Sequence, residues 1–300
     1  KLSEMDSMTQ LYNRNKYNEM LVNTYPKMDR IGVIFWDMNG LKMINDTMGH
    51  EYGDFAISAI AGSILENLAK DARAVLTHIA DSNVFVELKK EYAKDMVIGF
   101  IKLGGTTVGC VANQVSDGGD VLSTSGAYIA AEFVNFLDAF NIPVLTLTNV
   151  KGYKATVSEE KTIAKAAAKL TYAFANATVP KVNLVMGDAF GSAYLAMNSK
   201  SIGADIEYAW NTAKIGTMDA DQAVKIMYAD ELAKDGNNKD KVAAAKAEYI
   251  EKMSSAKAAA QRGYVDDIID GAATRKRLIA AFEMLYTKRE DRPLKKHGAV

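Results

Sequence analysis

The sequence predicts an α/β protein in which a short helix-strand-helix segment precedes a longer region of alternating strands and helices. Apolar residues make up 49% and charged residues 24% of the 300 residues, as in globular proteins. From residue 96 onward, short apolar runs alternate with stretches of helical periodicity, which is typical of layered α/β folds. The first 70 residues contain a single strand-like run, and one strand cannot form a stable sheet alone.

Charge and cysteine usage exclude several classes of function. Lys and Arg number 36 against 37 Asp and Glu, so the net charge of −1 gives no general attraction to nucleic acid or anionic lipid. Cys110 is the only cysteine, which excludes an intrachain disulfide and a cysteine zinc cluster. No apolar run reaches the length of a membrane span, and residues 1–10 lack a secretory signal. We therefore expect a cytoplasmic protein with no membrane span and no nucleic-acid partner.

The first segment is expected to contain two helices around one strand. Helical spacing of apolar residues predicts helices over residues 6–24 and 52–69. The apolar run at residues 30–37 ends in a carboxylate and predicts a buried strand. Glycine and asparagine between residues 40 and 50 predict a polar loop.

The longer region begins with a predicted hairpin. Apolar strands at residues 97–101 and 107–112 flank a Gly104-Gly105 turn. Downstream, apolar spacing predicts a helix near residues 129–140, a strand at 142–148, a helix near 163–174, a strand at 181–186, a short helix at 191–197, two short strands within 205–216, and helices at 220–228, 239–260 and 274–287.

Residues 6–65 resemble the N-terminal half of a GGDEF (diguanylate cyclase) domain. The matching segments are DSMTQLYNR at residues 6–14, FWDMNGLKMIND at 35–46 and GHEYGD at 49–54. The resemblance implies that Asp37 stands at the position of a magnesium ligand and that Asn45 and Asp54 stand at guanine-binding positions. A carboxylate suits Mg²⁺, and an amide with a carboxylate can hydrogen-bond guanine.

The same segment departs from the cyclase pattern. The second acidic position of the family is Asn39 here, and the GGDEF turn itself is missing. Gly118-Gly119-Asp120 matches part of that turn but is predicted to be a surface turn. We therefore expect a truncated fragment whose nucleotide and metal positions are vestigial, with magnesium bound only if the remnant is functional.

Residues 71–300 resemble the C-terminal domain of biotin-dependent acyl-CoA carboxylase carboxyltransferase subunits, of the propionyl-CoA carboxylase β and methylmalonyl-CoA decarboxylase α type. The segments that carry the resemblance include FLDAFNIPV at 136–144, AKLTYAFANATVPKV at 168–182, AFGSAY at 189–194 and RGYVDDII at 262–269. The resemblance implies the crotonase-like (ClpP/crotonase) fold, a superhelix of ββα turns. It divides the chain into a GGDEF-like fragment at 1–70 and a carboxyltransferase C-terminal domain at 71–300.

The resemblance also implies where carboxyl transfer takes place. Transfer between carboxybiotin and an acyl-CoA generates oxyanions, which backbone N–H groups at a helix start stabilise well. Gly191, Ser192 and Ala193 stand where the family places such donors, and they are the predicted catalytic positions. Gly152, Tyr153 and Phe190 occupy the predicted biotin-facing positions.

The implied cofactor is biotin on a carrier protein, with acyl-CoA as the substrate. The implied partners are a biotin carboxyl carrier protein, a carboxyltransferase N domain and like subunits in a homo-oligomer. In this family acyl-CoA binds mainly to the N domain, which the chain lacks, so we expect the chain to act as the biotin-side half of the enzyme. Two other classes stay open: a degenerate GGDEF nucleotide-binding signalling protein and a non-catalytic assembly subunit.

Overall fold

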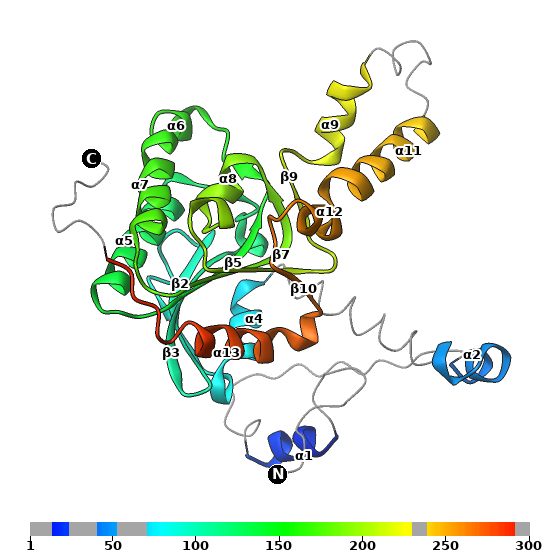
Figure 1. Ribbon diagram of the computed structural model, residues 1–300, viewed down its shortest axis with the longest axis horizontal. Coiled ribbons are helices and arrows are strands. Elements are labelled where there is room, and N and C mark those ends of the chain that lie inside the picture. The colour runs from blue at the N-terminus through cyan, green and yellow to red at the C-terminus, as the bar shows by residue number, and fades with distance from the viewer. Residues whose placement is uncertain (1–13, 24–40, 53–70, 230–238, 292–300) are drawn as a thin grey trace. The chain divides into compact units, whose positions relative to one another are not determined.

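The computed structural model describes residues 14–23, 41–52, 71–229 and 239–291 (Figure 1). Its contacts divide the chain into two compact units. The first comprises Lys1–Asn67 with Gly271–Ala273, and the second comprises Leu68–Asp270 with Thr274–Val300. Each unit is described by itself.

The first unit includes the α-helices α1 (Arg14–Asn23) and α2 (Leu41–Met48). The first lies within a predicted helix, but α2 replaces the loop predicted over residues 40–50. It ends at Gly49, whose φ of 94° breaks the helix and whose N–H donates to the Asn45 carbonyl at 3.0 Å. The polar residues therefore mark the end of a helix and not a loop. The predicted strand at 30–37 lies outside the described residues, as does most of the predicted helix at 52–69.

The second unit is built on an eight-stranded sheet with the order β1-β2-β3-β5-β7-β8-β10, and β9 pairs with β7 off this path. Its strands are β1 (Phe85–Leu88), β2 (Met96–Leu103), β3 (Thr106–Asn113), β5 (Val144–Val150), β7 (Lys181–Phe190), β8 (Ile206–Trp210), β9 (Lys214–Gly216) and β10 (Asp267–Ile269). The strands β1, β2 and β3 are antiparallel, which confirms the predicted hairpin, whereas β3, β5, β7, β8 and β10 are parallel.

Two successive strand-strand-helix units give the fold its spiral. In the first, β3 is followed by the short β4 (Val121–Leu122) and α5 (Thr124–Ala139). In the second, β5 is followed by the short β6 (Gly152–Tyr153) and α7 (Ile163–Asn176). Because β4 pairs with β6 in parallel as β3 pairs with β5, the second unit repeats the first one step along the sheet.

Helices cover both faces of the sheet (Figure 1). On one face, α5, α7 and α8 (Gly191–Ala196) pack on a core that includes Val144, Val185 and Ala209. On the other, α4 (Ala72–Ile79) and α13 (Thr274–Met284) pack on a core that includes Leu145 and Leu184. Alternate residues of each strand thus face opposite helical layers, as the two-residue period of a strand requires. The helix α4 lies outside the elements predicted from periodicity.

The predicted helix at 239–260 is interrupted. It consists of α11 (Lys239–Tyr249), a π-helical segment at Ile250–Ser254 and α12 (Ala256–Gln261). Ser255 is extended, and its hydroxyl accepts from the Ala258 N–H at 3.1 Å, so it caps a new helix instead of continuing the old one. By contrast, α9 (Ala220–Met227) forms within the helix predicted at 220–228, and Asp219 caps its start. The remaining short helices are Asp81–Asn83, Val115–Asp117, α6 (Val157–Glu160), Lys200–Ile202 and Gly271–Ala273.

Candidate functional site

The turn from β7 into α8 brings the predicted catalytic positions to the carboxyl end of the parallel strands. Gly191 has a φ of 60°, and a Cβ at this position would lie 3.2 Å from the Thr217 carbonyl oxygen. Glycine therefore permits a turn that a side chain would strain. Ser192 and Ala193 follow in the first turn of α8, where N–H groups have no acceptor within the helix. The local backbone thus offers hydrogen-bond donors at a chain reversal.

The second predicted segment lies against the first. Tyr153, in β6, donates from its Oη to the carbonyl oxygen of Ser192 at 3.1 Å. Burial raises the pKa of the Tyr153 phenol, so the group remains a protonated donor at neutral pH. The structure therefore brings Gly152 and Tyr153 together with residues 191–193.

Phe190, the third predicted biotin-facing position, lies at the end of β7, immediately before α8. Its side chain is only 3% exposed. Its N–H and carbonyl remain part of the strand that directs the chain into Gly191.

A row of polar side chains runs beneath α8. Thr146, Asn183 and Glu207 are in register across β5, β7 and β8, and each is fully buried. They share the sheet face that α8 covers, because their neighbours along each strand alternate between the two cores. Tyr194, the residue after Ala193, donates from Oη to Glu207 Oε1 at 2.6 Å. The row thus connects α8 to the sheet through hydrogen bonds.

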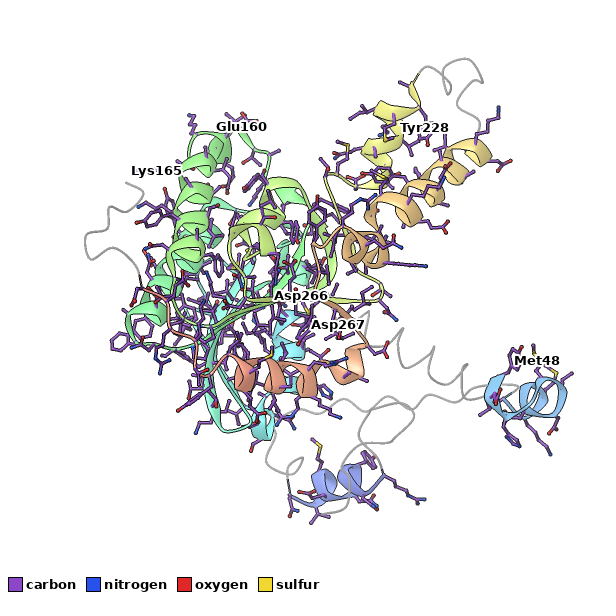
Figure 2. The ribbon with its side chains drawn as sticks, in the orientation of Figure 1. Met48, Glu160, Lys165, Tyr228, Asp266 and Asp267 are labelled. Carbon is purple, nitrogen blue, oxygen red and sulfur yellow. The ribbon has the colours of Figure 1, made fainter. Side chains whose placement is uncertain are left out.

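Glu207 is the residue of this site that the sequence analysis did not single out. Its carboxylate accepts from the Lys200 N–H at 2.5 Å and from Asn183 Nδ2 at 3.3 Å, in addition to Tyr194. Burial raises the pKa of Glu207 to about 7, and the nearby Asp266, labelled in Figure 2, acts in the same direction. The sequence feature that could have identified Glu207 is a single acidic residue within the otherwise apolar segment Ile206–Trp210.

The Gly118-Gly119-Asp120 segment forms a turn before β4, as predicted. Gly118 has a φ of 85°, which glycine adopts readily in a turn. The Asp120 carboxylate lies 3.5 Å from Lys151 Nζ, which also lies 3.9 Å from Asp188. Asp120 therefore takes part in a surface charge cluster.

The predicted nucleotide and metal positions are not brought together by any described contact. Asn45 lies in α2, in the first unit, where its carbonyl accepts the hydrogen bond from Gly49. Asp37 and Asp54 lie outside the described residues.

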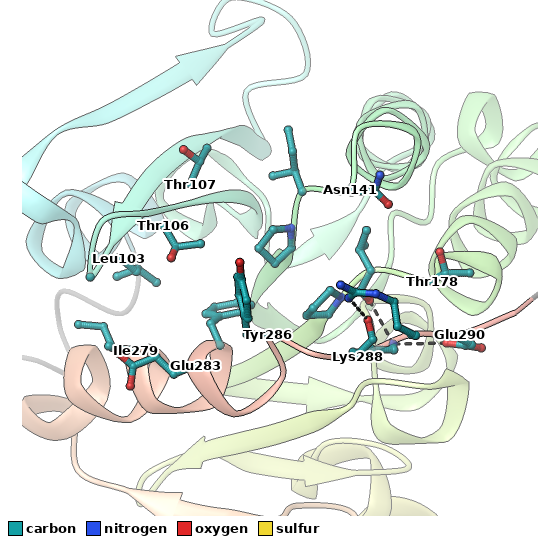
Figure 3. Close-up of a pocket in the computed structure, with 17 residues that line it drawn as sticks. Leu103, Thr106, Thr107, Asn141, Thr178, Ile279, Glu283, Tyr286, Lys288 and Glu290 are labelled. Atoms are coloured by element: carbon teal, nitrogen blue, oxygen red, sulfur yellow. Dashed lines mark hydrogen bonds and ion pairs between the residues drawn. The ribbon is translucent and has the colours of Figure 1, made fainter.

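A cavity of about 920 Å³ lies at the amino ends of the parallel strands (Figure 3). Gly191 lies at the opposite, carboxyl ends of these strands. The cavity is lined by residues that precede β5 and β7, including Pro143 and Pro180, and by Phe282 of α13. Its Lys288 ammonium is already bonded to the Asp205 carboxylate at 2.9 Å and to the Val179 carbonyl at 3.1 Å. The cavity is thus remote from the donors of α8, and its partly buried Lys288 is engaged in structural contacts.

Comparison with known proteins identifies the second unit. The model of the carboxyl transferase domain matches residues 65–300. The chain belongs to this family. A methylmalonyl-CoA carboxyltransferase 12S subunit of Propionibacterium freudenreichii subsp. shermanii is 42% identical over 230 residues, which are 76% of this chain and 44% of that protein. A putative propionyl-CoA carboxylase beta chain of Bacillus subtilis is 42% identical over 231 residues, 77% of this chain and 46% of that protein.

Solved structures of carboxyl transferase proteins confirm the crotonase-like fold. A transcarboxylase 12S structure, described as a hexamer assembly with substrate bound to a multienzyme core, matches with a TM-score of 0.73 and 41% identity over 76% of this chain and 44% of that one. The beta subunit of geranyl-CoA carboxylase from P. aeruginosa matches with a TM-score of 0.63 and 26% identity. The chain spans less than half the length of the curated relatives it matches.

The N-terminal segment matches a second family model. The model of the diguanylate cyclase GGDEF domain covers residues 3–94, which supports the resemblance of residues 6–65 to this family. Each helix in the described part of the chain is too short or too polar to cross a membrane.

Proposed function

We propose that residues 71–300 are the biotin-side half of an acyl-CoA carboxyltransferase, which moves a carboxyl group between carboxybiotin on a carrier protein and an acyl-CoA. The observation that carries the proposal is the chain reversal at Gly191. Its positive φ turns the chain from β7 into α8, whose first turn contains Ser192 and Ala193, in a chain of this family.

The residues present are compatible with such a reaction. When bound, biotin supplies the carboxyl group and an oxygen on which negative charge develops. The Ser192 and Ala193 amides are donors that need no charged side chain, and fixed donors of this kind stabilise developing charge without reorganisation. Tyr153 holds the Ser192 carbonyl and so fixes the turn that presents these amides.

We propose that the acyl-CoA side of the site is supplied by a carboxyltransferase N domain, since residues 65–300 match the carboxyl transferase family over part of its length. A carboxyltransferase N domain, from a separate chain, would complete the site, with a biotin carboxyl carrier protein delivering the group and like subunits forming an oligomer. The proposal also includes a cytoplasmic location.

Complementation tests the proposal. Carboxyl transfer to free biotin from a malonyl-type acyl-CoA is measured with this chain alone, a family N domain alone, and the two mixed. Activity that appears only in the mixture supports the proposal. A mixture that associates in sedimentation but transfers no carboxyl group contradicts it.

A second candidate is nucleotide binding by the N-terminal segment, favoured by the match to the GGDEF model over residues 3–94. Asp37 would be the magnesium ligand, and Asn45 and Asp54 would contact guanine. Calorimetry with GTP and Mg²⁺ tests this candidate. Heat of binding that is lost in Asp37→Ala supports it, whereas an absence of heat in the unaltered chain rejects it.

A further inference from the structure

Tyr194 connects the first turn of α8 to the interior of the sheet. It follows Ser192 and Ala193 directly, and its Oη reaches Glu207 Oε1 at 2.6 Å. Tyr194 is 6% exposed and Glu207 is 0% exposed, so water does not compete for this hydrogen bond. A shift of the Glu207 carboxylate is therefore transmitted to the backbone that carries the proposed donors.

Glu207 is in turn fixed from three sides. Its Oε2 accepts from the Lys200 N–H, in the short helix Lys200–Ile202 that follows α8. Its Oε1 also accepts from Asn183 Nδ2 of β7. Its own N–H donates to Asp266 Oδ2 at 2.8 Å. These contacts hold the Glu207 side chain in one position. Through its hydrogen bond with Tyr194, Glu207 also holds α8 in place.

We infer that Glu207 is a positioning residue for carboxyl transfer, which acts through Tyr194 to hold the first turn of α8 in place. The inference rests on the proposed function, because it assigns Glu207 to the site that this function uses. Glu207 itself lies beneath the helix and touches α8 through Tyr194 rather than facing the site.

The charge of Glu207 sets the strength of this anchor. The groups that face Glu207 and Tyr194 from the packed elements are Asn183 of β7, the Lys200 backbone, and Tyr264 and Asp266 before β10. The carboxylate accepts hydrogen bonds from Tyr194, Asn183 and Lys200, and its negative charge makes each of them stronger than a bond to the neutral acid. Burial raises the pKa of Glu207 to about 7, so the carboxyl becomes charged as the pH rises through neutrality. The charge strengthens the local hydrogen bond with Tyr194, although a buried charge lowers the stability of the fold as a whole.

Hydrogen exchange of the full chain tests the anchor without relying on activity. Exchange of a peptide spanning residues 191–197 is measured at pH 6 and pH 8 and corrected for intrinsic rates. We expect protection in the unaltered chain to rise roughly threefold to tenfold between the two pH values. Glu207→Gln should remove this pH dependence, and Tyr194→Phe should lower protection about tenfold at pH 8 while keeping the ring. Glu132→Gln, on the exposed face of α5, is the matched control and should behave as the unaltered chain. Equal protection in all four proteins overturns the inference.

The complemented transfer assay supplies the second readout. We expect Glu207→Gln to lower kcat about tenfold, to leave the KM for acyl-CoA unchanged, and to abolish a rise in rate centred near pH 7. The inference is wrong if the unaltered complex transfers the carboxyl group and the Glu207→Gln complex has the same kcat and the same pH profile. If the exchange differences are present but no protein transfers a carboxyl group, the proposed function fails and the anchor itself stands.

Discussion

Two acids at the start of β8, Asp205 and Glu207, are two residues apart and are stabilised in opposite ways. Asp205 faces the Lys288 ammonium at 2.9 Å and accepts the Lys181 N–H at 2.8 Å, so its charge is balanced by an opposite charge. Glu207 is completely buried and is held by a phenol, an amide and a backbone N–H, which are all neutral. Burial raises the pKa of Glu207, and no cation among the described residues contacts its carboxylate to offset this effect. Asp205 thus belongs to a structural ion pair, whereas Glu207, beneath α8, changes its charge near neutral pH.

The largest expected difference between the two acids is in the pH dependence of stability. Folded Glu207 retains its proton up to about pH 7, whereas the unfolded chain loses it near 4.5, so stability falls as the pH rises between these values. A shift of this size corresponds to at most about 3 kcal/mol between pH 4 and pH 8. Urea unfolding of the unaltered chain and of Glu207→Gln across this range measures it. The variant should lack this component of the pH dependence, and parallel curves for the two proteins would contradict the assignment.

A smaller loss is expected when the ion pair of Asp205 is broken. The Lys288 and Asp205 side chains are 13% and 20% exposed, and Lys288→Met leaves a carboxylate without its cation. We expect the free energy of unfolding at pH 7 to fall by about 2 kcal/mol. The matched control is Lys252→Met, which removes an exposed pair with Glu248 and should change stability by less than about 0.5 kcal/mol. Equal effects of the two substitutions would show that the buried pair is no more stabilising than the exposed one.

The smallest expected effect concerns the Gly191 turn, which begins the helix that Glu207 contacts through Tyr194. Gly191→Ala places a side chain at a φ of 60° and should lower the free energy of unfolding by about 1 kcal/mol. Gly152→Ala is the control, because a Cβ there meets nothing within 4 Å and the backbone has no positive φ. Thermal unfolding of both variants measures the difference. A Gly191→Ala protein as stable as the control would mean that this turn does not require glycine.

Much of the second unit is predictable from sequence because its elements have strong local signals. The hairpin joined by Gly104 and Gly105 is formed as predicted, and Asp219 caps its helix. Local sequence patterns predict the wrong element where a residue is compatible with both the interior of an element and its boundary. Ser255 lies within the helix predicted at 239–260, yet its hydroxyl caps the start of a separate helix, α12. Asn45 and Gly49 read as loop residues, yet they lie within and at the end of α2.

The candidate site is less predictable than the fold. The family resemblance places Gly191, Ser192 and Ala193, and the structure adds the contact between Tyr153 and Ser192. Glu207 escapes sequence reasoning because its importance depends on register: it meets Asn183 across the sheet and Tyr194 from the helix above. The sequence separates these residues by 24 and 13 positions, and no local pattern reports that they meet.

The central claim is that the backbone N–H of Ser192 serves carboxyl transfer. The most direct measurement is the rate of transfer by the complemented complex carrying Ser192→Pro, which removes this N–H, against Ser192→Ala, which keeps it. Proline is tolerated in the first turn of a helix, so the fold should survive, as circular dichroism can check. We predict a loss of about 100-fold or more for Ser192→Pro and less than about threefold for Ser192→Ala. Equal rates for the two folded variants would contradict the account.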